Sequence, residues 1–245
     1  SAIILSKGEA TTTEAIDSIG FANETLVILD SVTESEIKGS SNVKILKHEL
    51  AGDFSRQRNF ATTQAKGDWL LYLDSDEVLT KELAEEIQMV ISAPTAGGSS
   101  ASYFYLKRRD FFWDKELKYG ETKTAREKGF VRLHKKNSGT WKGLVHEEFV
   151  SEHIAESLKG FINHFPHKTI SEFLLSVNEY SSIRSKELRN NNVQFSSLKL
   201  IFYPLCKFIY TYFFKLGFLD GVGGFVYSFM MSLHSFLVRA KLLNL

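Results

Sequence analysis

Residues 53–77, which read DFSRQRNFATTQAKGDWLLYLDSDE, decide the fold class. The first part predicts a helix, with Asp53 as its N-cap and Gly67 just beyond its end. The apolar run at 69–73 then has the length of a strand that is buried on both faces of a sheet. A helix that leads into a buried strand is the repeating unit of α/β proteins, so the segment predicts this class.

The same alternation extends to both sides of this segment. Apolar runs at 2–5 and 25–29 precede it, and residues 80–91 predict a helix with one apolar face. Strands of a mixed or antiparallel part are expected at 101–106 and 129–133. We therefore predict a Rossmann-like sheet that is mixed but mainly parallel and is flanked by helices.

The chain changes character near residue 168, where the pattern becomes helical to the end. We expect two domains, an α/β domain at 1–167 and a helical segment at 168–245. Residues 192–245 carry five Lys or Arg side chains against one Asp, whereas the whole chain has a net charge of +1. The aromatic and basic residues at 196–245 predict attachment to an anionic membrane surface. A buried helical hairpin and an interface between copies of the chain are the alternatives.

Composition excludes several classes of function. A net charge of +1 gives no reason to expect a nucleic-acid partner. The single cysteine, Cys206, excludes an internal disulfide and a cysteine-rich zinc site. The opening residues show no signal-peptide pattern, so we expect a cytoplasmic protein that is peripheral to the inner membrane.

Carboxylates stand where predicted strands end. Asp30 follows the run at 25–29, and Asp74 and Asp76 follow the run at 69–73. In open α/β sheets, ligands bind at the carboxyl ends of strands. In extended chain, Asp74 and Asp76 point to the same side, and paired carboxylates suit Mg²⁺ or Mn²⁺. Such a metal would bridge the diphosphate of a nucleotide sugar. A solvated turn that caps the next helix is the alternative.

Taken in order, three segments resemble the signatures of family 2 glycosyltransferases, in the branch of lipopolysaccharide-core glucosyltransferases. They are residues 53–77, residues 131–147 with their Val-Arg-Leu-His and Val-His-Glu sequences, and residues 215–225. The resemblance implies a GT-A fold. It also implies transfer of a sugar with inversion, from a nucleotide sugar such as a UDP-hexose to a glycan or lipid-linked acceptor of the cell envelope.

The resemblance also implies roles for single residues. On the donor side it places Asp30 and Ser31 at the nucleobase, Arg58 near the nucleotide and Asp74 at the ribose or the metal. The remaining roles concern the metal and the acceptor. Asp76 would bind the metal, and Glu147 would be the general base with His146 beside it. Independently of the resemblance, His164 is expected to reach the diphosphate or the metal, with a structural or surface histidine as the alternative.

Two departures from the family pattern leave alternatives open. Residues 7–9 read Lys-Gly-Glu where the family has Asn-Glu, and residues 31–35 lack its Gly-Ser-Thr-Asp run. A degenerate member that binds glycans or membranes without catalysis is the main alternative. A nucleotidyltransferase would need a richer glycine loop than residues 6–9 provide. A zinc hydrolase is disfavoured because Val150 replaces the second histidine of His-Glu-x-x-His.

Overall fold

The computed structural model describes residues 1–30, 42–92, 100–144 and 147–243, which form two compact units. The first unit comprises Ser1–Arg108 and Glu127–His164, and the second comprises Arg109–Arg126 and Phe165–Leu245. The helical C-terminal part therefore shares its unit with an excursion of the chain at 109–126. The domain boundary at 167/168 stays a prediction.

The first unit is built on a mixed sheet with the strand order β3-β2-β1-β4-β8-β6-β11-β5. The pairings within β3-β2-β1-β4 are parallel, whereas β4 with β8, β8 with β6, and β5 with β11 are antiparallel. The mixed α/β fold is thus confirmed, with a larger antiparallel share than the sequence indicated. The strands are β1 (Ala2–Ser6), β2 (Thr25–Leu29), β3 (Val43–Lys47), β4 (Trp69–Asp74), β5 (Glu77–Leu79), β6 (Tyr103–Phe112), β8 (Phe130–Lys135) and β11 (Ala155–His164).

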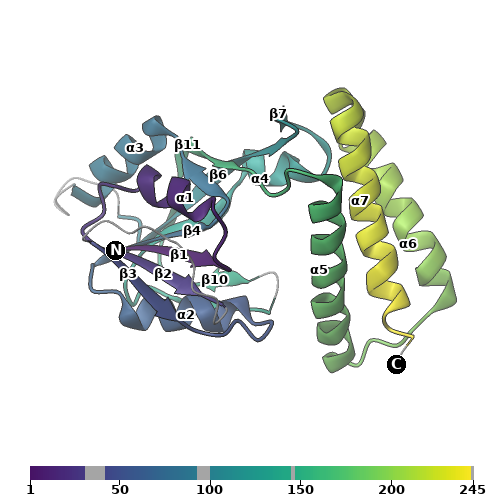
Figure 1. The fold of residues 1–245 in the computed structure, drawn as a ribbon, viewed down its shortest axis with the longest axis horizontal. Helices are drawn as coiled ribbons and strands as arrows, with labels where there is room; N and C mark the ends of the chain where they lie inside the picture. The colour runs from purple at the N-terminus through teal and green to yellow at the C-terminus, as the bar shows by residue number, and fades with distance from the viewer. Residues whose placement is uncertain (31–41, 93–99, 145–146, 244–245) are drawn as a thin grey trace. The chain divides into compact units, whose positions relative to one another are not determined.

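Helices cover both faces of this sheet (Figure 1). Helices α1 (Thr12–Ser18) and α3 (Lys81–Ser92) lie on one face and α2 (Phe54–Gln64) on the other. Neighbouring residues of β1 show the alternation: Ile4 joins the core under α1 and α3, and Ile3 joins the core under α2. A short sheet of β9 (Thr140–Lys142) and β10 (Glu148–Val150) completes the unit.

The predicted helix starts are confirmed by their caps. The Asp53 carboxylate accepts a hydrogen bond from the Arg56 backbone N–H at 2.9 Å, and the Thr80 hydroxyl accepts one from the Leu83 N–H at 3.3 Å. Both caps satisfy backbone donors that the first turn of a helix leaves unpaired. The segment 53–77 therefore folds as its local sequence indicates.

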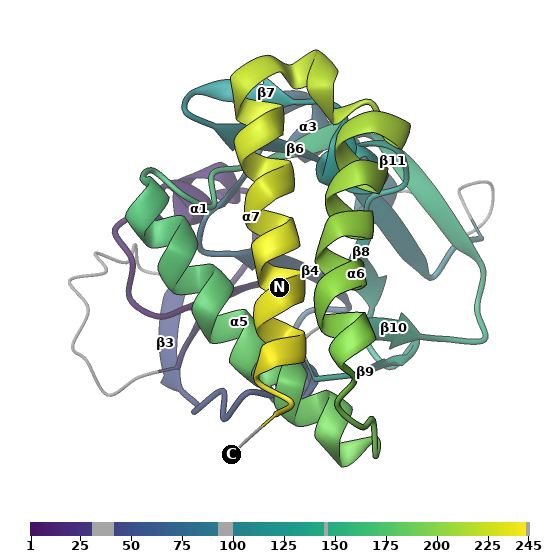
Figure 2. The same cartoon turned by 90° about the vertical axis from the view of Figure 1, so that its right-hand side faces the viewer.

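The second unit contains three long helices, α5 (Ile170–Asn190), α6 (Ser197–Ile209) and α7 (Gly221–Ala240). Figure 2 shows α7 between α5 and α6. The short elements β7 (Lys115–Leu117), 3-10 turn η1 (Gly120–Thr122) and α4 (Lys123–Glu127) precede them. The buried carboxylate of Asp220 accepts hydrogen bonds from the backbone N–H groups of Lys118 and Tyr119. This contact ties the excursion at 109–126 to the start of α7.

Candidate functional site

Two parallel strands present carboxylates at the same edge of the sheet. Asp74 is the last residue of β4, which lies between β1 and β8, and Asp30 directly follows β2. The register pairs Leu5 of β1 with Asp74, so β1 and β4 end at the same edge of the sheet. The strand ends therefore bring the predicted donor-side carboxylates to one edge, as the rule for open sheets requires.

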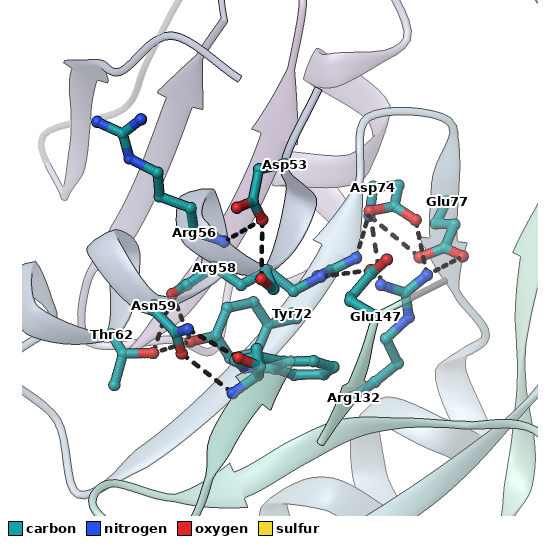
Figure 3. Close-up of polar contacts among 12 residues, drawn as sticks. Asp53, Arg56, Arg58, Asn59, Thr62, Tyr72, Asp74, Glu77, Arg132 and Glu147 are labelled. Carbon is teal, nitrogen blue, oxygen red and sulfur yellow. Dashed lines mark hydrogen bonds and ion pairs between the residues drawn. The ribbon is translucent and has the colours of Figure 1, made fainter. Parts of the chain in front are cut away.

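Two arginines hold Asp74 (Figure 3). Arg58 Nη2 donates to Asp74 Oδ1 at 3.0 Å, and Arg132 Nη2 donates to Oδ2 at 2.6 Å. Both guanidinium groups are buried. Burial alone would raise the pKa of Asp74, but the charges of Arg132 and Arg58 outweigh it, so the pKa lies well below its usual range.

Glu77 joins this arrangement and is fully buried. Its Oε1 accepts from Arg132 Nη2 at 2.9 Å and from Arg108 Nη1 at 3.3 Å. Its Oε2 accepts from the backbone N–H of Asp74 at 3.0 Å. The sequence offered no role for Glu77 or Arg132. The signal that could have identified Arg132 is its place at a buried position of a strand, where an arginine is unusual.

Arg58 also joins Asp74 to Glu147. Its Nε donates to Glu147 Oε1 at 2.8 Å, while the guanidinium lies 5.0 Å from the centroid of the Trp141 ring and 5.5 Å from that of Tyr72. The Glu147 side chain is 15% exposed and precedes β10. One side chain thus bridges two carboxylates that lie far apart in the sequence (Figure 3).

The carboxylate of Asp76 faces His164. Its Oδ2 is 3.4 Å from His164 Nε2, because β5 and β11 pair His164 opposite Glu77. Burial raises the pKa of Asp76, but the interaction with His164 more than offsets it, so the pKa is lowered. The structure therefore brings together the two predicted metal-side residues Asp76 and His164.

Asp76 and His164 are the candidate ligands of a divalent metal in this site. Among the described residues, no group of three or more His, Cys, Asp or Glu side chains could hold a metal ion. Mg²⁺ and Mn²⁺ in such sites take one or two protein ligands and complete their shell with substrate phosphates and water. Asp76 supplies the oxygen ligand that these cations prefer, whereas the His164 imidazole would add a less typical nitrogen ligand. Both oxygens of Asp74 already accept hydrogen bonds from arginines, so few of its lone pairs remain for a metal or a ribose hydroxyl.

The remaining predicted residues lie at the same edge or outside the described part. Asp30 Oδ1 accepts from the backbone N–H of Leu50 at 2.5 Å. In the loop after β1, the Glu9 carboxylate accepts from the Lys7 N–H at 2.8 Å and from the Ser6 hydroxyl at 2.9 Å. The departure from the family pattern at 7–9 is therefore an internally hydrogen-bonded loop. Ser31 and His146 lie outside the described residues.

Comparison with known proteins shows which family the chain resembles. The model of Glycosyl transferase family 2 matches residues 22–148, which include Arg58, Asp74, Asp76, Arg132 and Glu147. An uncharacterized glycosyltransferase of Rickettsia bellii is 26% identical over 254 residues, covering 100% of this chain and 86% of the relative.

Two further similarities are to a named relative and to a solved structure. The lipopolysaccharide core biosynthesis glycosyltransferase LpsC of Rhizobium meliloti is 26% identical over 252 residues, covering 98% of this chain and 90% of the relative. Among solved structures, S. aureus TarS 1-349 in complex with UDP-GlcNAc aligns with a TM-score of 0.47 at 13% identity, covering 96% of this chain and 80% of that chain.

Proposed function

The chain belongs to glycosyl transferase family 2, and we propose that it transfers a sugar with inversion from a nucleotide diphosphate sugar, taken here as a UDP-hexose, to an acceptor hydroxyl. One observation carries this proposal. A single buried guanidinium, that of Arg58, brings Glu147 to the strand ends where Asp74 stands. A base and a donor-side carboxylate in one cluster are what a direct displacement needs.

Glu147 is the proposed general base. The acceptor oxygen attacks the anomeric carbon from the face opposite the diphosphate, and the bond from that carbon to the phosphate oxygen breaks with its electron pair leaving on the diphosphate. Glu147 takes the acceptor proton. Its Oε1 accepts from Arg58, so Oε2 is the oxygen that receives the proton. The predicted place of His146 beside this base remains part of the proposal.

The donor side is proposed to follow the strand ends. Asp30 and Ser31 accept from the nucleobase, and ionised Asp74 accepts from a ribose hydroxyl. Asp76 and His164 are the residues that would hold Mg²⁺ or Mn²⁺. The metal, when bound, neutralises charge on the departing diphosphate. These roles are supported by the shared sheet edge and by the ionised state of Asp74.

The acceptor is proposed to be a glycan or lipid-linked glycan of the cell envelope. The name of the relative LpsC places that protein in lipopolysaccharide core synthesis, and a lipid-linked acceptor would confine this enzyme to a membrane surface. We therefore propose a peripheral location on the cytoplasmic face of the inner membrane.

The helical unit supports attachment through residues 196–245. Large apolar side chains there are exposed, among them Leu198 (69%), Phe214 (76%) and Val222 (72%). Within the described residues 196–243 the only acidic side chain, that of Asp220, is buried, so this segment carries basic groups without an exposed carboxylate. The helical segment Gly217–Ala240 is also long and apolar enough to cross a membrane, with a mean hydropathy of 1.4 and 28% burial.

The test of the donor site is a calorimetric titration of UDP with Mn²⁺ and then with EDTA. Asp76→Ala removes a proposed metal ligand, and Asp68→Ala removes an exposed carboxylate just before the other end of β4. We expect Mn²⁺-dependent binding that Asp76→Ala weakens about tenfold or more and Asp68→Ala leaves unchanged. If no nucleoside diphosphate binds, the donor site is wrong and the non-catalytic alternative is favoured.

A further inference from the structure

We propose that Arg58 is a positioning residue that holds the Glu147 carboxylate in its reactive orientation and does not contact the nucleotide. The inference rests on the proposed function and changes one part of it, because the family resemblance places Arg58 near the nucleotide. It follows from the burial of Arg58, the partners of its nitrogens and the contacts of its neighbour Asn59.

Arg58 has no hydrogen-bond donor at the surface to offer a nucleotide. The residue is 1% exposed, Nε and Nη2 are used by Glu147 and Asp74, and Nη1 is buried with no partner among the described residues. Arg56 is the contrasting case, because it is exposed on the same helix and points away from Glu147 in Figure 3. Of these two arginines, only Arg56 is open to solvent, and it lies on the side of α2 away from Glu147.

The guanidinium of Arg58 is held in place by its surroundings. It lies over the ring of Trp141, and Arg58 is fixed in α2, whose first turn is capped by Asp53. A planar guanidinium donates in fixed directions, so a guanidinium locked by packing also fixes the orientation of the carboxylate it contacts. Because it is deeply buried, its charge also needs the carboxylates of both Asp74 and Glu147 nearby.

The next residue, Asn59, holds the same piece of structure. Its side-chain amide donates to the Trp141 carbonyl at 2.9 Å, and its side-chain oxygen accepts from the Trp141 N–H at 3.1 Å. Trp141 belongs to β9, which pairs with β10, and Glu147 directly precedes β10. Two consecutive side chains of α2 thus fix both the strand pair and the carboxylate at its edge.

This arrangement would persist through the transfer step. When Glu147 takes the acceptor proton on Oε2, Oε1 still accepts from Arg58 Nε, and Asp74 still balances the guanidinium charge. The base therefore keeps its orientation as it changes from carboxylate to acid. A residue that acts in this way should affect the rate of transfer more than the affinity for the donor.

The test is Arg58→Lys, with Arg56→Lys as the matched control on the same helix. Lysine keeps the charge but lacks the fork that contacts two carboxylates. Wild-type protein and variants are given UDP-glucose, UDP-galactose and UDP-N-acetylglucosamine, and release of UDP to water is followed. We expect Arg58→Lys to lower kcat roughly 10- to 100-fold while the Kd for UDP changes less than about twofold. Arg56→Lys should leave kcat unchanged.

A second variant keeps the proposal testable if Arg58→Lys does not fold. Trp141→Phe shortens the ring under the guanidinium and keeps the backbone groups of residue 141 that Asn59 binds. We expect the same split between kcat and Kd, at smaller size. If either folded variant weakens UDP binding as much as it lowers kcat/KM, Arg58 is a nucleotide ligand and the inference is overturned. If the wild-type protein neither binds UDP nor releases it, the proposed function fails instead.

Discussion

Charged side chains are buried in the first unit of this protein, whereas large apolar side chains are exposed in the second. Arg58 and Glu77 are 1% and 0% exposed, yet Phe214 and Val222 are 76% and 72% exposed. Either situation is unfavourable in water unless something compensates for it. The buried charges have their partners within the chain, in the cluster around Asp74. For the exposed apolar side chains of the second unit, the proposed partner is an anionic membrane surface.

This difference separates two kinds of mutation. In the first unit, a change to a buried polar group should alter stability or chemistry, because its partners are already in place. In the second unit, a change to an exposed apolar group should leave stability unchanged and alter attachment to another surface. The following predictions test that separation, beginning with the largest expected effect.

His134 should make the first unit sensitive to acid. It is stacked between Tyr72 and Phe149, with ring centroids 5.4 and 4.2 Å away, and burial lowers its pKa to about 4. The unfolded chain, with a histidine pKa near 6.5, binds more protons below that pH, so stability falls as the pH drops from about 6.5 towards 4. We expect urea unfolding to show about 2.5 kcal/mol of this loss between pH 7.5 and pH 4.5.

Substitution of His134 tests whether this residue causes the loss of stability at low pH. His134→Gln should remove that part of the pH dependence, whereas His153→Gln, at an exposed position, should retain it. Equal pH dependence in the two variants would show that His134 is not the group responsible.

Attachment of the second unit should depend on the outer face of α6. Phe202 is 53% exposed, and Phe202→Glu should weaken sedimentation with vesicles of anionic phospholipid about tenfold, because it removes apolar contact and adds a repelled charge. The matched control is Met89→Glu on α3, where the methionine is 66% exposed. Neither variant should lower the Tm.

Two outcomes would contradict attachment of the outer face of α6 to a membrane. Unchanged vesicle binding by Phe202→Glu would show that α6 does not contact the membrane. A dimer of the wild-type protein that the variant dissociates would identify the face as an interface between copies of the chain.

The smallest effect is expected where the second unit has an internal polar contact. The Lys241 ammonium donates at 2.6–2.8 Å to the Asn178 carbonyl, the Asn178 side chain and the hydroxyls of Ser181 and Ser182, and so ties the end of α7 to α5. Lys241→Met should lower the free energy of unfolding by about 1 kcal/mol, measured in urea. Lys199→Met, at an exposed position of α6, is the control. An equal loss of unfolding free energy in the control would show that the Lys241 contact does not stabilise the protein.

Local signals in the sequence were enough for much of the fold. The caps at Asp53 and Thr80, the buried strands and the long C-terminal helices are confirmed, because capping and apolar periodicity act within a few residues. The strand-end position of Asp74 and its closeness to Glu147 agree with the expected order of motifs.

Contacts between distant segments could not be predicted in the same way. The pairing of Arg132 with Glu77 depends on how β8 lies beside β4, and the bond from Arg58 to Glu147 depends on how the pair of β9 and β10 packs against α2. Helical periodicity does not mark Arg58 as buried, since a charged residue is ordinarily expected on the solvent side. The excursion at 109–126 joins the helices through Asp220, which local sequence does not indicate.

The central claim is that donor binding and proton removal are carried by separate groups of the cluster, and Glu147→Gln tests it most directly. The same sample is titrated with UDP and assayed for release of UDP from the sugar donor that the wild-type protein uses, with Glu148→Gln at the exposed neighbouring position as control. The account predicts turnover lowered about 10²- to 10⁴-fold with the Kd for UDP within about twofold, and an unaffected control. Retained turnover, or loss of UDP binding together with turnover, would contradict it.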